Sequence, residues 1–209
     1  MKNRKKLLTL VCCLAIVAAV SLGATLAYLT ASDSVANIFT VGKIVPPEDS
    51  GFLDEAKVDE YGKPDESGDR VDSNTYKLLP GHTYTKDPTV HIGAESESCY
   101  IFVKVDNGIA AVTEAIDPTK TENEKWQLLD NQNYPGIYYQ KYDKDAKTPK
   151  YDFVVFDEFK VLGTATATNL DAVKDNKIVV NAYIIQSDGF KTAALAYAAY
   201  LNQANPVSE

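Results

Sequence analysis

The chain has 209 residues, of which 45% are hydrophobic and 24% charged, and its formal net charge at pH 7 is −8. A chain of this length can bury one sizeable core, so a single globular domain is expected. The acidic balance makes nucleic acid a poor partner and argues against functions in DNA or RNA binding.

The first 27 residues have the pattern of a secretory signal peptide. Uncharged apolar residues fill positions 7–22 and small residues follow at Gly23, Ala24 and Ala27, after a basic start formed by Lys2, Arg4, Lys5 and Lys6. This order predicts export and cleavage between Ala27 and Tyr28. Residues 28–209 would then form one secreted domain. A retained membrane anchor is the alternative, because the apolar run could be extended to about twenty residues.

Cleavage would change both the charge and the thiol content of the chain. The formal charge would fall from −8 to −12, since four basic residues leave with the signal. Cys99 would be the only thiol left, so an internal disulfide is excluded. Cys99 lies in an apolar strand pattern, which favours a small buried side chain over a catalytic thiolate.

Two segments lie between the predicted signal peptide and the predicted strands. Residues 28–45 are extended in pattern, and residues 46–75 hold ten acidic residues against three basic ones, with few large apolar residues. We expect the second segment to be a long, exposed acidic loop. Residues 65–72 carry the oxygen ligands that calcium prefers, so a weak calcium site is conceivable, but they lack the ligand spacing of an EF-hand. No other cofactor is indicated.

From residue 75 onward, β-branched and aromatic residues alternate with polar ones, which predicts strands. The expected strands cover residues 82–92, 99–106, 126–129, 136–142, 153–161 and 178–186. Pro80 and Gly81 mark a turn, and Lys86-Asp87-Pro88 should interrupt the first strand because proline lacks a ladder donor. Residues 126–129 and 136–142 are expected to form a hairpin.

One strand has a clear division of faces. Ile101, Val103 and Val105 should point to one side and Tyr100, Phe102 and Lys104 to the other. Helices are predicted over residues 109–115 and 190–202, and a polar crossover over residues 164–175. These elements together predict a mainly β fold, an antiparallel jelly-roll or immunoglobulin-like sandwich with one or two short helices.

Catalytic motifs are scarce, and no catalytic or metal-binding residue is predicted. The two histidines, His82 and His91, lack the spacing that places two zinc ligands on one helix. They could converge on a metal with Asp87 if the strand folds back at Pro88, but two exposed strand histidines are expected. Asp157 and Glu158 should face opposite sides of their strand, which argues against shared proton chemistry.

Three segments carry a resemblance to a known family. They are residues 23–44, with the stretches GATLAYLT and NIFTVGKI, residues 79–90, with Pro80-Gly81 and Lys86-Asp87-Pro88, and residues 182–190, with Gln186. Together they resemble the TasA and camelysin family. The resemblance implies a jelly-roll-like domain, secreted by a Gram-positive bacterium through a signal peptidase of the SipW type, that assembles into biofilm matrix fibres. The protease label of camelysin-like relatives is not carried over, because a zinc-protease pattern is lacking.

These observations favour a non-enzymatic structural subunit of the extracellular matrix or cell surface that polymerises with copies of itself. The segment 28–45 could leave its own domain and complete a neighbour's sheet through the apolar side chains of Val35, Ile38, Phe39, Val41 and Ile44. Such head-to-tail contacts give filaments. The alternative is that the segment is the first strand of its own sandwich. An accessory matrix or anchoring protein is a further possible partner.

Two other functions stay open. An extracellular carbohydrate- or protein-binding module would use exposed tyrosines, namely Tyr134, Tyr138, Tyr139 and Tyr142. Tyr138 and Tyr139 are adjacent in a strand and should face opposite ways. A camelysin-like metalloendopeptidase would depend on His82 and His91.

Overall fold

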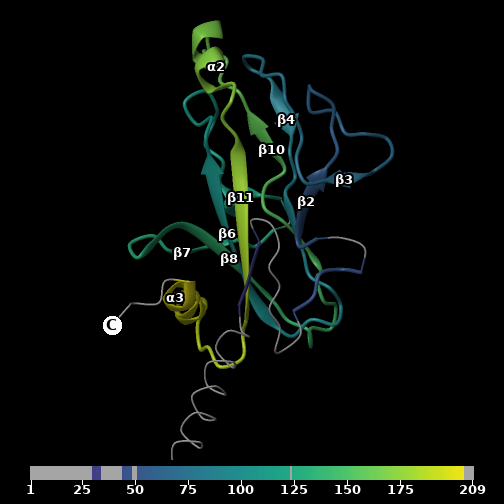
Figure 1. Cartoon of the computed structure of the whole chain (residues 1–209), viewed down its shortest axis with the longest axis vertical. Helices are drawn as coiled ribbons and strands as arrows, with labels where there is room; N and C mark the ends of the chain where they lie inside the picture. Colours follow the sequence, from purple (N-terminus) through teal and green to yellow (C-terminus); the bar gives the residue numbers. More distant parts are fainter. Residues whose placement is uncertain (1–29, 34–43, 49–50, 123, 205–209) are drawn as a thin grey trace, which may run out of the picture.

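The computed structural model describes residues 30–33, of which only the backbone is described, and residues 44–48, 51–122 and 124–204. The predicted cleavage site at Ala27 and Tyr28 lies outside this part. Antiparallel strands form one five-stranded, one four-stranded and one two-stranded sheet (Figure 1). The predicted mainly β, antiparallel architecture with short helices is therefore confirmed, whereas the jelly-roll topology stays a prediction.

The five-stranded sheet contains the three nine-residue strands β6, β8 and β11. Its order is β1 (Thr30–Asp33), β11 (Ile178–Gln186), β6 (Cys99–Asn107), β8 (Tyr134–Tyr142) and β7 (Gln127–Asp130). β6 and β11 pair along their whole length, from Ile178 opposite Asn107 to Gln186 opposite Cys99. β7 and β8 form the predicted hairpin, with a register shift between Leu128 and Asp130.

The other two sheets consist of short strands. The four-stranded sheet has the order β3 (Arg70–Val71), β2 (Leu53–Ala56), β5 (Thr89–His91) and β9 (Asp152–Val154), and the two-stranded sheet joins β10 (Glu158–Lys160) to β4 (Thr83–Thr85). The chain passes from one sheet to the other at Lys86-Asp87-Pro88, where an interruption is predicted. It passes again between β9 and β10, so the single strand expected over residues 153–161 is two strands in different sheets.

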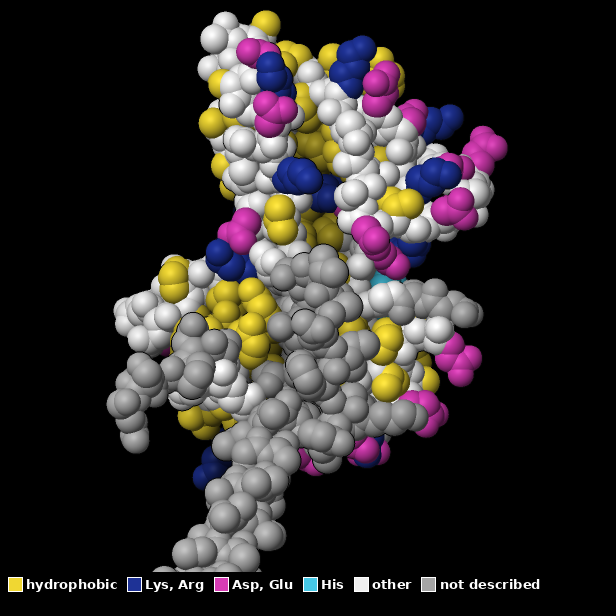
Figure 2. Space-filling model, viewed as in Figure 1, with side chains coloured by type: hydrophobic (Ala, Val, Ile, Leu, Met, Phe, Trp, Pro, Cys, Tyr) yellow, Lys and Arg dark blue, Asp and Glu magenta, His cyan; other side chains and the backbone are white. Residues whose placement is uncertain are grey.

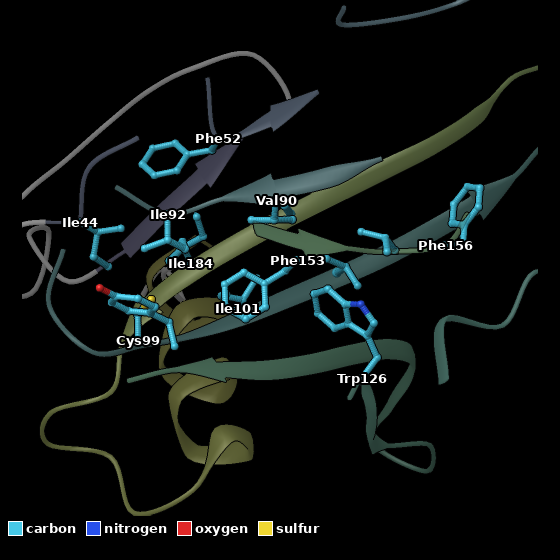
Figure 3. Close-up of a cluster of buried hydrophobic side chains, with 14 residues drawn as sticks. Ile44, Phe52, Val90, Ile92, Cys99, Ile101, Trp126, Phe153, Phe156 and Ile184 are labelled. Carbon is cyan, nitrogen blue, oxygen red and sulfur yellow. The ribbon is translucent and has the colours of Figure 1, made fainter. Parts of the chain in front are cut away.

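The main core lies between the five-stranded and four-stranded sheets. Ile101 and Val103 of β6 meet Val90 of β5 and Phe153 of β9 there (Figure 3). Trp126 closes one side of this core, and its indole Nε1 donates a hydrogen bond to the Val154 carbonyl at 2.7 Å. Cys99 is fully buried in the same cluster, as expected, and burial raises the pKa of its thiol.

The outer face of the five-stranded sheet is covered by α3 (Ala193–Ala204), which confirms the helix expected near the end of the chain. Ala196 and Tyr197 of this helix pack on Phe102 and Ile185. Ile101 and Phe102 thus bury their side chains in separate cores on the two faces of β6, as their alternation predicts.

Two predictions about the segments that connect the strands are wrong. In place of the expected helix, residues 109–112 form hydrogen-bonded turns and Thr113 forms a bridge to Val161; Asn107 accepts from the Ile109 backbone at 3.0 Å and donates to Thr113 at 2.9 Å. The polar crossover contains α2 (Ala167–Val173), a helix that periodicity did not reveal. Its Thr166 and Asn169 form a capping box. A 3₁₀ turn, η1 (Pro118–Lys120), follows the first of these segments.

The segment 46–75 differs most from its expectation. Instead of a purely exposed loop, it contains β2 and β3, and Glu55 is only 3% exposed. Phe52 is buried in the main core. Four of the acidic side chains have basic partners from the same segment or from the β4–β5 junction, which periodicity alone cannot indicate; they are Asp54, Glu55, Asp65 and Asp69.

Candidate functional site

β11 has one edge that its neighbour covers only in part. β1 pairs with the outer edge from Thr30 opposite Ile185 to Asp33 opposite Ala182. The inner edge of β11 is paired with β6 along all nine residues. Among the described residues, no strand pairs with the outer edge of β11 from Ile178 to Asn181. Backbone groups on such an edge can pair with an added strand.

A groove of about 1190 Å³ runs beside this half of β11. One wall is formed by Ile178, Val179 and Val180 together with α2, and the opposite wall by β2 and residues 72–78. Figure 1 shows these two walls as separate arms above the main core, and Figure 2 shows hydrophobic side chains recessed between them. Val179 is 42% exposed, which is unusual for a large apolar side chain in a long strand.

The floor and rim of the groove differ in chemistry. Ile109 and Phe159 lie at the floor and belong to a second buried cluster that includes Tyr84, Val112 and Val161. The rim carries both charges, with Lys77, Lys174 and Lys177 near Asp72, Asp171 and Asp175. An apolar floor between charged rims suits a segment with alternating apolar and polar side chains.

The structure describes only one residue of the predicted donor set. Ile44 is 4% exposed and packs in the main core of its own chain, near Phe52 and Ile92 (Figure 3). Val35, Ile38, Phe39 and Val41 lie outside the described residues. β1 ends with Asp33 opposite Ala182, next to the stretch Ile178–Asn181 whose outer edge pairs with no described strand.

The family motif residues organise the crossing between sheets. Gly81 has a φ of 76° and its N–H donates to the Val161 carbonyl at 3.1 Å, so Pro80-Gly81 forms the predicted turn. Asp87 accepts from the Ala56 backbone, and the Pro88 carbonyl accepts from Val155 at 2.8 Å. Gln186 ends β11 opposite Cys99. These residues hold β2 and β9 against β5.

A polar network crosses the four-stranded sheet, and sequence patterns did not reveal it. Arg70 pairs with Asp54 and Asp87, and its Nη2 donates to the Thr89 hydroxyl at 2.8 Å. His91 is buried, and its two ring nitrogens lie 2.8 Å from Asp54 and 2.7 Å from Asp152. His91 thus lies between carboxylates of β2 and β9, the strands on either side of β5.

The histidines therefore differ from the exposed pair that was expected. His91 is buried in this network, while His82 places its Nε2 2.9 Å from the Tyr61 carbonyl, and the two do not meet. In the described part of the chain, no group of three or more His, Cys, Asp or Glu residues could hold a metal ion. The metallopeptidase alternative thus gains no support from these residues.

Two of the acidic residues that suggested calcium, Asp65 and Asp69, share a basic partner. Lys57 Nζ lies 3.0 Å from Asp65 and 3.6 Å from Asp69. The backbone N–H of Ser67 and the Lys57 ammonium lower the pKa of Asp65 to about 2. The Lys57 ammonium thus already balances part of the negative charge of Asp65 and Asp69.

The four tyrosines considered for ligand binding do not share a surface. Tyr142 is buried in the main core, and Tyr138 packs against that core as well. Tyr139 faces the other side, as predicted, and Tyr134 packs edge-on against Tyr197 of α3 with ring centres 5.2 Å apart. A common aromatic platform would need these side chains on one face.

Comparisons with family models, with curated proteins and with solved structures found no match to this chain. None of the helices in the described ranges is long and apolar enough to cross a membrane.

Proposed function

We propose that the mature chain is a secreted structural subunit of extracellular matrix fibres of the TasA type. Each subunit would insert its N-terminal segment, residues 28–41, into the groove of the next. The observation that carries this proposal is that no described strand pairs with the outer edge of β11 from Ile178 to Asn181, beside a groove of about 1190 Å³. Strand addition at this edge would satisfy its backbone groups.

The length and pattern of the donor segment fit this role. Residues 34–41 would extend roughly 26 Å as a strand, at about 3.3 Å per residue, so they could pair with all of Ile178–Asn181 and reach beyond it. Val35, Phe39 and Val41 have the odd-numbered spacing that places side chains on one face. That face would meet the apolar floor of the groove.

The described ends of the segment suggest how it could be exchanged. Among the described residues β1 pairs over four positions, whereas β6 and β11 pair over nine, so β1 would be the easier strand to detach. Ile44 is buried in its own core and would stay there as the anchor. A monomer would hold its own segment on β11, and assembly would replace it with a neighbour's segment. This replacement gives an open, head-to-tail filament.

Cysteine cross-linking separates donation to a neighbour from closure within one chain. Mature chains with Ile38→Cys are mixed with chains carrying Val179→Cys under assembling conditions and then oxidised. Donation predicts disulfide-linked heterodimers between the two variants. Leu195→Cys, at an exposed apolar position on α3, serves as the acceptor control and should give few.

Two outcomes would contradict the proposal. One is a chain with both Ile38→Cys and Val179→Cys that cross-links only within itself in sedimented filaments. The other is a chain lacking residues 28–41 that forms filaments as readily as the complete mature chain, as seen by electron microscopy and sedimentation.

A further inference from the structure

The carboxylate of Glu55 lies between a lysine and an asparagine. Glu55 Oε2 contacts Lys86 Nζ, and Oε1 accepts from Asn74 Nδ2 at 2.9 Å. Oε1 also accepts from the Asn74 backbone N–H at 2.8 Å. The three side chains come from β2, from the chain before Tyr76 and from the β4–β5 junction. One buried carboxylate thus brings an amine and a carboxamide together.

The Asn74 carboxamide is held in a fixed orientation. Its Oδ1 accepts from the Val58 backbone N–H at 3.0 Å, and its Nδ2 also donates to the Ala56 carbonyl at 2.9 Å. The Val58 N–H is placed to stabilise negative charge on Oδ1 if the carbonyl carbon is attacked. The Val58 N–H would thus act as the hydrogen-bond donor that stabilises the oxyanion in an acyl-transfer reaction.

The carboxylate and the amine are largely removed from water. Glu55 is 3% exposed and the Lys86 side chain 11% exposed. The Tyr76 ring centre lies 6.0 Å from Lys86 Nζ, and the same ring packs edge-on against Phe159 at 5.2 Å. Exclusion of water strengthens the electrostatic interactions between groups that react in such a site.

We propose that Lys86 and Asn74 become joined by an isopeptide bond, with Glu55 as the proton carrier. Glu55 takes a proton from the Lys86 ammonium, and the freed Nζ lone pair attacks Asn74 Cγ. The tetrahedral intermediate places its negative charge on Oδ1, next to the Val58 N–H. Protons pass through Glu55 from Nζ to Nδ2, the Cγ–Nδ2 bond breaks, and the amide carbonyl re-forms.

The reaction balances without an added reagent. A lysine ammonium and an asparagine carboxamide give one secondary amide and one ammonium ion, and no oxidant or reductant is required. Glu55, Asn74 and Lys86 all line the groove, so ammonia has a route to solvent. The cross-link would tie residues 72–77 to the β4–β5 junction in a chain whose Cys99 has no thiol partner outside the predicted signal.

Tryptic peptide mapping of the wild-type chain tests this bond directly. Cleavage should leave the peptide 71–77 attached to the peptide 78–104, because acylated Lys86 resists trypsin. The branched product should weigh about 17 Da less than the sum of the two peptides, through loss of ammonia. Intact wild-type protein should show the same deficit against its own sequence mass.

Three variants sharpen the result. Lys86→Arg and Glu55→Gln should release the free 71–77 peptide, whereas Lys57→Arg, at an exposed lysine paired with Asp65, should keep the branched product. Asn74→Asp would lose water instead of ammonia and give a chemically identical cross-link. A wild-type chain with full sequence mass and a free 71–77 peptide would overturn the proposal, whether or not any variant folds.

Discussion

The two large sheets of this protein are held together by different interactions. The five-stranded sheet contains three strands of nine residues, and its central strand β6 buries apolar side chains on both faces. The four-stranded sheet has strands of two to four residues, which share the main core through Val90 and Phe153 and are linked by Arg70, Asp54 and Asp87. The first sheet depends mainly on apolar area removed from water, whereas the second adds charged hydrogen bonds to the shared core. Experiments should therefore be able to separate the effect of substituting a buried apolar side chain from the effect of substituting a charged side chain.

The largest loss of stability is expected in the centre of the five-stranded sheet. Ile101 is fully buried between the sheets, so Ile101→Ala removes apolar contacts and leaves a cavity. We expect the free energy of unfolding to fall by about 2–5 kcal/mol. Urea denaturation of the wild type and the variant measures this difference.

The matched control for Ile101 is an aliphatic side chain of similar size on the surface. Leu195 of α3 is exposed, so Leu195→Ala should change the free energy of unfolding by less than about 0.5 kcal/mol. Equal losses for the two variants would mean that burial between the sheets is not what stabilises this region.

In the four-stranded sheet, the corresponding test is Arg70→Met. The substitution keeps an apolar stem but leaves Asp54, Asp87 and Thr89 without their shared donor. We expect a loss of about 1–3 kcal/mol, because Arg70 is 32% exposed and water can replace part of the network. The loss should shrink in high salt when the wild type is measured under the same conditions.

Lys57 provides a control with the same charge and a similar pairing. It also contacts two aspartates, Asp65 and Asp69, but it is 46% exposed. Lys57→Met should therefore cost less than about 1 kcal/mol. If Lys57→Met is as costly as Arg70→Met, burial does not distinguish the two ion-pair groups.

The difference between the sheets also explains what the sequence could predict. β11 and β6 are long and rich in β-branched and aromatic residues, so the sequence could predict both strands, and for β6 also the division of its faces. The hairpin and the break at Pro88 follow from local turn chemistry. A strand of this length carries enough residues for its period to be recognised.

The missed features depend on partners that are distant in the sequence. Arg70 and Asp87 are 17 residues apart, and His91 meets Asp152 across 61 residues. β3 has only two residues, too few to show a period. The groove needs both arms of the fold, so residue order alone could suggest the donor segment but not its acceptor. Only the capping box of α2 was a local signal that could have been used.

The aromatic layer under α3 gives the apolar sheet a pH dependence at alkaline pH. Burial, and then the nearby Tyr183 and Tyr200 hydroxyls, raise the pKa of Tyr197 to about 12, from an ordinary value near 10. The folded chain then holds this proton more tightly than the unfolded chain. Its contribution to stability is complete below pH 10 and is lost as pH rises through 12.

Urea denaturation between pH 9 and pH 12 measures this contribution. Tyr197→Phe should lose less stability across that interval than the wild type, because the phenylalanine has no proton to give up. Parallel curves for the two proteins would show that Tyr197 does not contribute to the decline.

The smallest expected effect separates local from long-range stabilisation in α2, the helix beside the groove. Thr166 caps this helix, and its hydroxyl accepts from the Asn169 backbone. Thr166→Ala should cost about 1 kcal/mol in urea denaturation. Thr168→Ala, at an exposed position inside the helix, should instead be neutral or slightly stabilising, since alanine is the better helix former.

Because Leu170 and Val173 of α2 line the groove, a cap variant should also weaken filament formation, whereas the interior variant should not. Equal effects of both variants on stability and assembly would mean that helix capping does not hold this wall of the groove in place.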